Sequence, residues 1–320
     1  MAVRKEPQPD PADGRIHVEM PTSDPDGIVR HLPGEIKPAG VGYTGAMRRI
    51  DAALRNSGDP FGRAMADWLD LDEISPPEVR LDALVRDAQA ASDPRPYGLA
   101  YEACYGDFQS VLTGRPATSP ACASLSAVDW ARLDPGNAEP WLFALDRAVE
   151  AGDAAAQREA MQRMADSSRF DVHFFAGSAA VARLRMHRDA DLAAQSMATM
   201  KAAAITFPPY QALTVRCHDR ADGDVDLAAN CARIAQMMFD HSDTFVARAI
   251  GGSVHRLLTG DTSWLDRAHR EQRSTRPVQT AALDNTPCGA QREFLRHIVR
   301  MDAIGEMKLA QEARRAASAP

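Results

Sequence analysis

The sequence reads Leu133-Asp134-Pro135-Gly136-Asn137-Ala138-Glu139-Pro140-Trp141, and Gly152-Asp153 follows eleven residues after the tryptophan. Trp141, Leu142, Leu145 and Ala148 are spaced to form one buried face of a helix. Gly152 supplies the positive φ that ends a helix. A second helix then runs to Met164. The stretch therefore predicts two antiparallel helices joined by a Gly-Asp turn.

This stretch resembles one unit of the tetratricopeptide repeat family, over about residues 133–166. Six residues match the family pattern. Asp134, Pro135 and Asn137 match the turn before helix A, Trp141 matches the tryptophan of helix A, and Gly152 and Asp153 match the turn between the helices. The chain departs from the family at Gln157, where the family prefers alanine, and we find no second clean copy. The run Cys122–Leu142 is also loosely similar to uncharacterised helical proteins of proteobacteria, many of them exported. The resemblance implies a helical repeat with a concave face and no particular activity.

The rest of the chain after about residue 43 also reads as consecutive helices. Alanine is the commonest residue and the best helix former. Asp59-Pro60 and Asp93-Pro94, 34 residues apart, both combine a helix cap with proline at the first helical position. Further helices are expected near 172–186, 190–205, 208–220, 225–240, 243–258 and 262–272. We predict an all-α fold in which antiparallel hairpins stack as an irregular tetratricopeptide-like α-solenoid or α-α superhelix.

Two segments differ from this pattern. Residues 1–42 are rich in proline and glycine without apolar periodicity, which predicts a flexible arm. Residues 43–320 are then a single helical domain. Its last part, from about Ala290 to Ala316, reads as one long helix that Gly305 can bend.

Charge and hydropathy exclude several classes of partner. The formal charge is -7 and the isoelectric point about 5.7, which argues against nucleic acid because phosphates need a basic face. We find no stretch of about 18 apolar residues, so we expect no membrane span in this chain. The first residues contain no intact signal peptide, and an upstream anchor remains open.

Four of the five cysteines are placed to form two disulfides. Cys104 and Cys122 flank a turn region, and Cys217 and Cys231 each lie seven residues from Asp224. Positions equidistant from a hairpin turn face one another, which suits a disulfide. Such bonds persist in an oxidising compartment. The alternative is four free core cysteines in a cytosolic protein. Cys288 is left over, either as a free thiol or as an interchain partner.

A search for catalytic patterns returns none, so we predict no catalytic, cofactor-binding or metal-ligating residue. The nine histidines are dispersed. The acidic residues around Gly223 do not follow the calcium-loop order and indicate a capped turn. Met197, Met200, Met237 and Met238 are interpreted as core residues. Gly251-Gly252 indicates close helix packing or a helix break.

Two functions remain open. The first is a non-enzymatic helical scaffold of the bacterial envelope, periplasmic or secreted, that binds a protein or peptide. The second is an enzyme, for example a hydrolase, with a site assembled from scattered His and Asp residues in a helical groove; a cytoplasmic location is the alternative to export. A pocket with convergent histidine and acids favours the enzyme, and a shallow groove or apolar patch favours the scaffold.

Overall fold

The computed structural model describes residues 41–69, 76–106, 119–185, 189–203, 208–218, 224–281 and 287–317. Within these ranges the regular structure is helical, and the β-type pairing consists of two isolated bridges. The predicted all-α fold class is therefore confirmed. Residues 1–40 of the predicted arm lie outside the described residues, and helix α1 begins at Val41.

The helices follow one another in three groups along the chain. The first group comprises α1 (Val41–Arg55), α2 (Pro60–Leu69), α3 (Pro77–Ala90), α4 (Pro94–Tyr105), the short 3-10 helix η1 (Pro120–Ser124) and α6 (Ala127–Leu133). The second comprises α7 (Glu139–Glu150), α8 (Ala154–Ala165), α9 (Ala176–Ala182) and α10 (Asp189–Ala203). The third comprises α11 (Tyr210–His218), α12 (Val225–His241), α13 (Phe245–Thr259), α14 (Ser263–Ala281), α15 (Pro287–Ile304) and α16 (Glu306–Ala317).

The predicted helix starts are capped as their sequences indicate. The carboxylate of Asp59 accepts a hydrogen bond from the Phe61 N–H, and that of Asp93 accepts one from the Arg95 N–H. Ser126 caps α6 by accepting from the Asp129 N–H. These side chains satisfy amide groups that have no partner inside their helices.

Helices α7 and α8 form the predicted hairpin. Gly152 has φ +66°, which a residue with a side chain rarely adopts, and Asp153 accepts from two amides of the first turn of α8. Gln157 also joins the two helices by donating to the Ala148 carbonyl. Trp141 is partly buried against the core, with the Arg163 guanidinium 5.5 Å from its ring centre.

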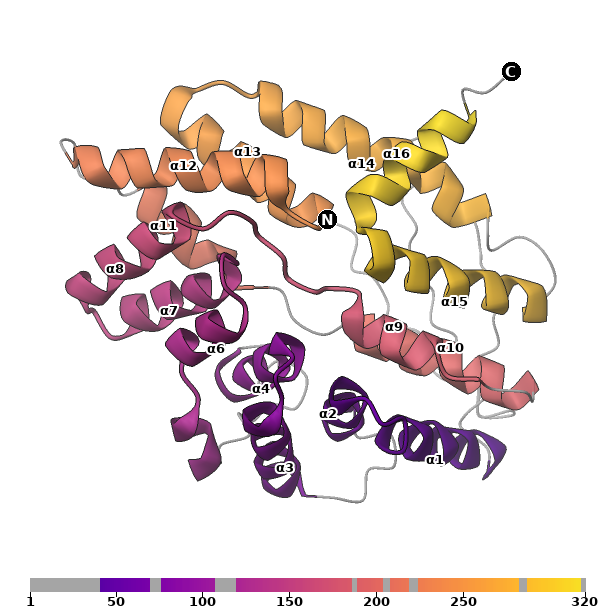
Figure 1. Cartoon of the computed structure of the whole chain (residues 1–320). Helices are drawn as coiled ribbons and strands as arrows, with labels where there is room; N and C mark the ends of the chain where they lie inside the picture. Colours follow the sequence, from indigo (N-terminus) through magenta and orange to yellow (C-terminus); the bar gives the residue numbers. More distant parts are fainter. Residues whose placement is uncertain are drawn as a thin grey trace, which may run out of the picture.

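The helices pack in a closed circuit that Figure 1 lets the reader follow. The first half of the circuit follows chain order, with each helix packing on the next: α1, α2, α3, α4, α6, α7 and α8. Helix α8 then packs on α12, and the contacts continue through α13 and α14 to α16 and α15. Helix α15 packs on α9 and α10, and α10 packs on α1, which closes the circuit. Chain order is interrupted after α8. There the chain crosses the molecule to α9 and α10, and it then returns to α11, which packs against α7 and α13.

The segment between α8 and α9 corrects one prediction. Residues 171–175 are not helical, so the helix expected near 172–186 begins only at Ala176. Its backbone is held by hydrogen bonds to two other segments instead. The Phe170 N–H donates to the His241 carbonyl, and the Asp243 N–H donates back to the Phe170 carbonyl. The apolar pattern gave no sign of this long-range pairing.

The C-terminal helix was also predicted too long. Gly305 has φ +79° and its N–H donates to the Met301 carbonyl, so it ends α15 and α16 begins at Glu306. Glu306 then accepts a hydrogen bond from the Phe245 N–H at the start of α13. The break therefore places the last helix against the middle of the chain.

The assignment of four methionines to the core is confirmed for two of them. Met237 and Met238 are buried, but Met197 and Met200 on α10 are exposed, so their assignment to the core was wrong. The glycine pair lies in an unbroken α13, where the close-packing interpretation is confirmed. A Cβ on Gly251 would lie 2.8 Å from the Ala235 carbonyl oxygen, and one on Gly252 would lie 2.9 Å from the Leu265 nitrogen.

Both predicted cysteine pairs are at disulfide distance. The Cα atoms are 5.6 Å apart for Cys104 and Cys122, and 5.9 Å apart for Cys217 and Cys231. The second pair joins α11 to α12, where both cysteines are fully buried. The side chain of Cys288 and the residues Asp222 and Gly223 lie outside the described part of the chain.

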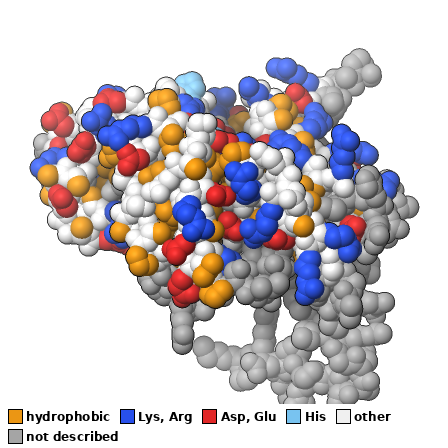
Figure 2. Space-filling model, turned by 60° about the horizontal axis from the view of Figure 1, so that its bottom comes forward, with side chains coloured by type: hydrophobic (Ala, Val, Ile, Leu, Met, Phe, Trp, Pro, Cys, Tyr) orange, Lys and Arg blue, Asp and Glu red, His pale blue; other side chains and the backbone are white. Residues whose placement is uncertain are grey.

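The surface carries a mixture of charges. On the face in Figure 2, hydrophobic side chains are scattered between acidic and basic ones. Two arginines of α15 are ion-paired, since Arg296 contacts Glu293 and Arg300 contacts Glu312. Among the described helices, none is sufficiently long and apolar to cross a membrane.

Candidate functional site

The turn that precedes α7 forms a buried polar hub. Asn137 is 1% exposed and its side chain makes four hydrogen bonds. Its amide donates to Asp134 Oδ2 and to the Asp171 carbonyl, both at 2.7 Å. Its oxygen accepts from the Glu139 N–H at 3.2 Å and the Asp171 N–H at 3.0 Å. One amide thus joins the start of α7 to residues Arg169–Phe175, the crossing segment, through which the chain passes from α8 to α9.

The crossing segment brings together residues that are distant in sequence. Its Arg169 carbonyl accepts from the Ala138 N–H, and its Val172 N–H donates to Asp243 Oδ1 at 3.3 Å. The Arg169 guanidinium also pairs with the Asp134 carboxylate. Polar side chains from the turn at 134–139, from the segment itself and from the start of α13 therefore meet at one seam.

His173 is held at this seam in a left-handed backbone conformation, with φ +47°. Its Nε2 is 3.4 Å from Asp134 Oδ2 and its Nδ1 is 3.4 Å from Asp171 Oδ1. Burial acts to lower the pKa of His173, but its hydrogen bond to the Asp134 carboxylate and the charge of Asp171 outweigh burial and raise this pKa. Burial acts to raise the pKa of Asp134, and its bonds with His173 and Asn137 leave it lowered.

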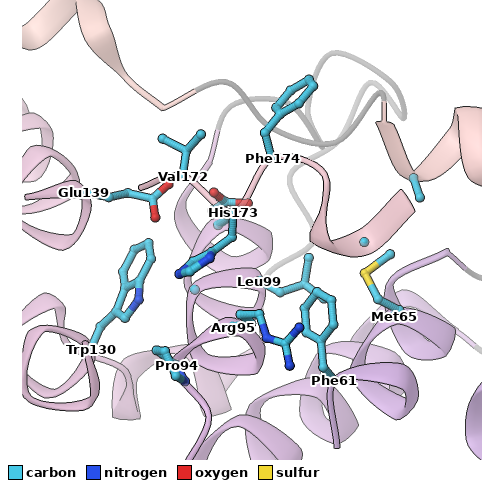
Figure 3. A pocket seen from close by; sticks show the side chains of 14 residues that line it. Phe61, Met65, Pro94, Arg95, Leu99, Trp130, Glu139, Val172, His173 and Phe174 are labelled. Atoms are coloured by element: carbon cyan, nitrogen blue, oxygen red, sulfur yellow. The ribbon is translucent and has the colours of Figure 1, made fainter. Parts of the chain in front are cut away.

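A cavity of about 50 Å³ opens beside this seam (Figure 3). Its walls come from α2, α4, α6, the first turn of α7, the crossing segment, α9 and α10. The lining residues are Phe61, Met65, Pro94, Arg95, Gly98, Leu99, Glu102, Trp130, Glu139, Val172, His173, Phe174, Gly177 and Ala202. The innermost of these are buried, and Pro94, Arg95 and the three residues of the crossing segment are partly exposed at the rim.

Two of the residues that line the cavity each have a buried polar atom without a hydrogen-bond partner. These atoms are Oε1 of Glu139 and Nε1 of Trp130, and each residue is 1% exposed. Burial, together with the negative charge of Glu102, raises the pKa of Glu139 well above the usual range of a carboxyl group. Unpartnered buried polar groups are costly, so such a pair requires an explanation.

Further ionisable groups lie around the cavity and behind it. Arg95 pairs with Asp93 and lies over the Phe61 ring at 4.7 Å. Burial and the charge of Asp171 raise the pKa of Asp243 well above its usual range. Burial and the charge of Glu139 raise the pKa of Tyr210. Glu139 in the cavity wall and Asp243 behind it are therefore carboxyl groups that hold their protons strongly.

The chemistry available at the site follows from its lining. The described side chains around the cavity include two carboxyl groups, an imidazole, a guanidinium and an indole N–H, set among apolar walls. In the parts of the chain that the structure describes, no group of three His, Cys, Asp or Glu residues has a metal-binding arrangement. The arrangement can donate and accept hydrogen bonds and can hold a proton.

The residues predicted from sequence divide between this site and the hairpin. Asp134 and Asn137 of the repeat signature form the seam, and Glu139 follows them directly. The other signature residues have different places: Pro135 lies exposed in the turn, Trp141 packs on the hairpin, and Gly152 and Asp153 form the inter-helix turn. The paired cysteines are not among the residues that line the cavity.

Sequence reasoning missed Glu102, Trp130, Glu139 and His173 as site residues. Glu139 follows a helix-start signal, where an exposed glutamate is ordinary. Glu102 lies within a stripe of buried residues on α4, and this is the one available signal. Nothing in the local sequence of His173 indicated contact with a residue 39 positions earlier.

Comparisons with protein-family models, with curated proteins and with solved structures found no significant match to this chain. The site is therefore interpreted from its geometry.

Proposed function

We propose that this protein is a non-enzymatic helical scaffold of the bacterial envelope that binds a protein or peptide. The observation that carries the proposal is the size of the cavity. About 50 Å³ has room for roughly three or four non-hydrogen atoms, if each takes the space of a water molecule. A cavity of this size accepts the tip of a larger molecule, and a side chain of a protein partner is such a tip.

Two other features support the location and class of this scaffold. The cysteine pairs at disulfide distance favour an oxidising compartment, periplasmic or extracellular. The hairpin α7–α8 retains the turn residues of a tetratricopeptide-like unit. We propose that the described helices are a degenerate relative of such arrays, in which α9 and α10 are packed out of chain order.

Site-specific photocrosslinking tests the proposal. A photoreactive amino acid replaces Phe174, which is partly exposed at the cavity rim, in a chain produced in its native host. The matched control carries it at Val149, which is exposed at the other end of α7, about 15 Å along the helix. We expect a discrete protein adduct in the envelope fraction from position 174 alone. Equal labelling from both positions, or no adduct, contradicts the proposal.

A second candidate, a hydrolase, is favoured by one specific observation. His173 and two glutamates converge on the same cavity, and Glu139, whose pKa is raised, has the property of a general acid. This function predicts turnover of an ester, amide or glycoside substrate that is lost in Glu139→Gln. Turnover unchanged in Glu139→Gln, or none across such substrates, contradicts it.

A further inference from the structure

We infer that the cavity between α4, α6 and α7 binds a primary carboxamide, such as the side-chain tip of glutamine or asparagine. The inference rests on the proposed function, because a peptide partner supplies the group. It deepens that proposal by naming the chemistry that the cavity recognises.

The two unpartnered atoms define what the ligand must offer. The Trp130 N–H needs an acceptor, and Glu139 Oε1 needs a donor when it is ionised or when its proton is on the other oxygen. A carboxamide supplies a carbonyl oxygen and an NH₂ group from one rigid plane. An ammonium group has no acceptor for the indole. A carboxylate can accept from the indole and from a protonated Glu139, so it is disfavoured by its charge rather than by a missing donor.

The remaining lining favours a neutral group. The carboxyl groups of Glu102 and Glu139 share the wall with the Arg95 guanidinium and the His173 imidazole. Arg95 is already paired with Asp93, and His173 with Asp134 and Asp171. Asp243 and Tyr210 interact with this cluster from behind the wall. An anionic ligand in such a space loses its hydration without gaining a dedicated counter-ion, because both basic side chains already have acidic partners.

Size and wall chemistry agree with this assignment. A carboxamide has three non-hydrogen atoms, which matches the room in a cavity of about 50 Å³. Figure 3 shows Phe61, Leu99, Met65 and Val172 around the space, where they can contact the methylene group that carries the amide. Glu139 and Trp130 lie together on one side of the space in the same view.

Indole NMR signals give a direct test on the full chain. The four tryptophans produce four indole ¹H–¹⁵N signals, and the variant Trp130→Phe assigns the relevant one. We expect acetamide to move the Trp130 signal with a dissociation constant of about 1 mM, weak because the ligand has only four non-hydrogen atoms. We expect acetate, ethylammonium and N,N-dimethylacetamide, which lacks the N–H donor, to leave it unchanged.

A matched pair of variants tests the contact with the carboxyl group. Glu139→Met keeps the length of the side chain and removes its oxygens, whereas Glu150→Met makes the same change at an exposed position on the same helix. We expect acetamide affinity to fall at least about tenfold in the first variant and to be unchanged in the second. If Glu139→Met does not fold, the ligand series on the unaltered protein still decides the question.

Several outcomes overturn the inference. No indole shift at about 100 mM acetamide means that the cavity holds only water. An equal shift with ethanol means that a hydroxyl group is recognised instead. As a second arm, N-acetylglutamine and N-acetylasparagine methylamides must bind more tightly than their glutamate and aspartate forms. A crosslinked partner that lacks carboxamide dependence leaves the proposed scaffold standing and refutes this inference alone.

Discussion

The hairpin α7–α8 and the crossing segment Arg169–Phe175 are neighbours in the chain but are held in different ways. In the hairpin, the amide of Asp153 bonds to the Ala148 carbonyl, and its side chain bonds to residues two and three positions ahead. In the crossing segment, partners lie 34 residues earlier at Asn137 and 71 residues later at Asp243.

This difference shows that polar groups in the hairpin find hydrogen-bond partners nearby in the chain, whereas those in the crossing segment find them far away in the chain. The turn of the hairpin forms its hydrogen bonds within the hairpin and near the surface, so these bonds do not depend on distant segments. The crossing segment has no helical bonds of its own between residues 171 and 175 and depends on buried side chains from two other segments. We therefore expect the seam to be the more sensitive of the two regions.

The largest effect is expected at the hub of the seam. Asn137→Ala leaves two N–H groups, one carbonyl and one carboxylate oxygen without their partner in a buried place. We expect the free energy of unfolding to fall by about 4 kcal/mol, measured by urea denaturation. A loss no greater than that at the hairpin turn, described below, refutes the distinction between the two regions.

The next effect concerns a second local hairpin, α11–α12. Replacing Cys217 and Cys231 together by alanine removes a cross-link that closes a 14-residue separation. We expect a loss of about 3 kcal/mol in the free energy of unfolding. The unaltered protein should have an intact mass about 4 Da below its fully reduced mass, since two disulfides lack four hydrogens. Four titratable thiols among Cys104, Cys122, Cys217 and Cys231 contradict this result.

A pH series separates the seam from the hairpin. Glu139 has a raised pKa, so its ionisation costs stability, and this cost is absent below pH 4.5 and grows as pH rises through the folded pKa. His173 contributes stability that is complete below pH 6.5 and is lost as pH rises through its raised pKa. Glu139 and His173 therefore both lower the free energy of unfolding as the pH rises.

The free energy of unfolding should therefore fall as the pH rises above 4.5, and fall further above pH 6.5. The fall should be flatter in Glu139→Gln, with an effect smaller than that of losing the disulfide. Thermal denaturation across this range, with Glu150→Gln on the exposed part of α7 as the control, measures the difference. A stability that rises with pH in this window contradicts the assignment.

The smallest effect is expected at the inter-helix turn. Asp153→Ala removes an exposed cap that accepts two amide hydrogen bonds from the first turn of α8. We expect a loss of about 1 kcal/mol because water can replace the carboxylate. Asp153→Asn is the matched control and should retain most of the stability, while a loss comparable to that of Asn137→Ala means that the hairpin is not autonomous.

The sequence predicted what is local and missed what is distant. The caps at Asp59 and Asp93 and the Gly152-Asp153 turn were predicted because each depends on a few adjacent residues. The cysteine pairs were predicted because hairpin geometry relates positions across a turn.

The site itself was not predictable in this way. Glu139, Glu102 and His173 come from three elements, and only the path of the crossing segment brings them to one cavity. The exposed face of α10 was misassigned for the same reason, since Met197 and Met200 are apolar but no helix covers them in the described structure. Side-chain type alone does not specify which neighbour a helix acquires.

The pairing of α1 with α10 has a consequence for how the chain is made. Arg49 on α1 contacts Asp191 on α10, 142 residues later. During synthesis, α1 therefore cannot form its contacts with α10 until residues 189–203 have been translated. A ring that closes on its own beginning therefore delays native folding of its N-terminal end until α10 has been made.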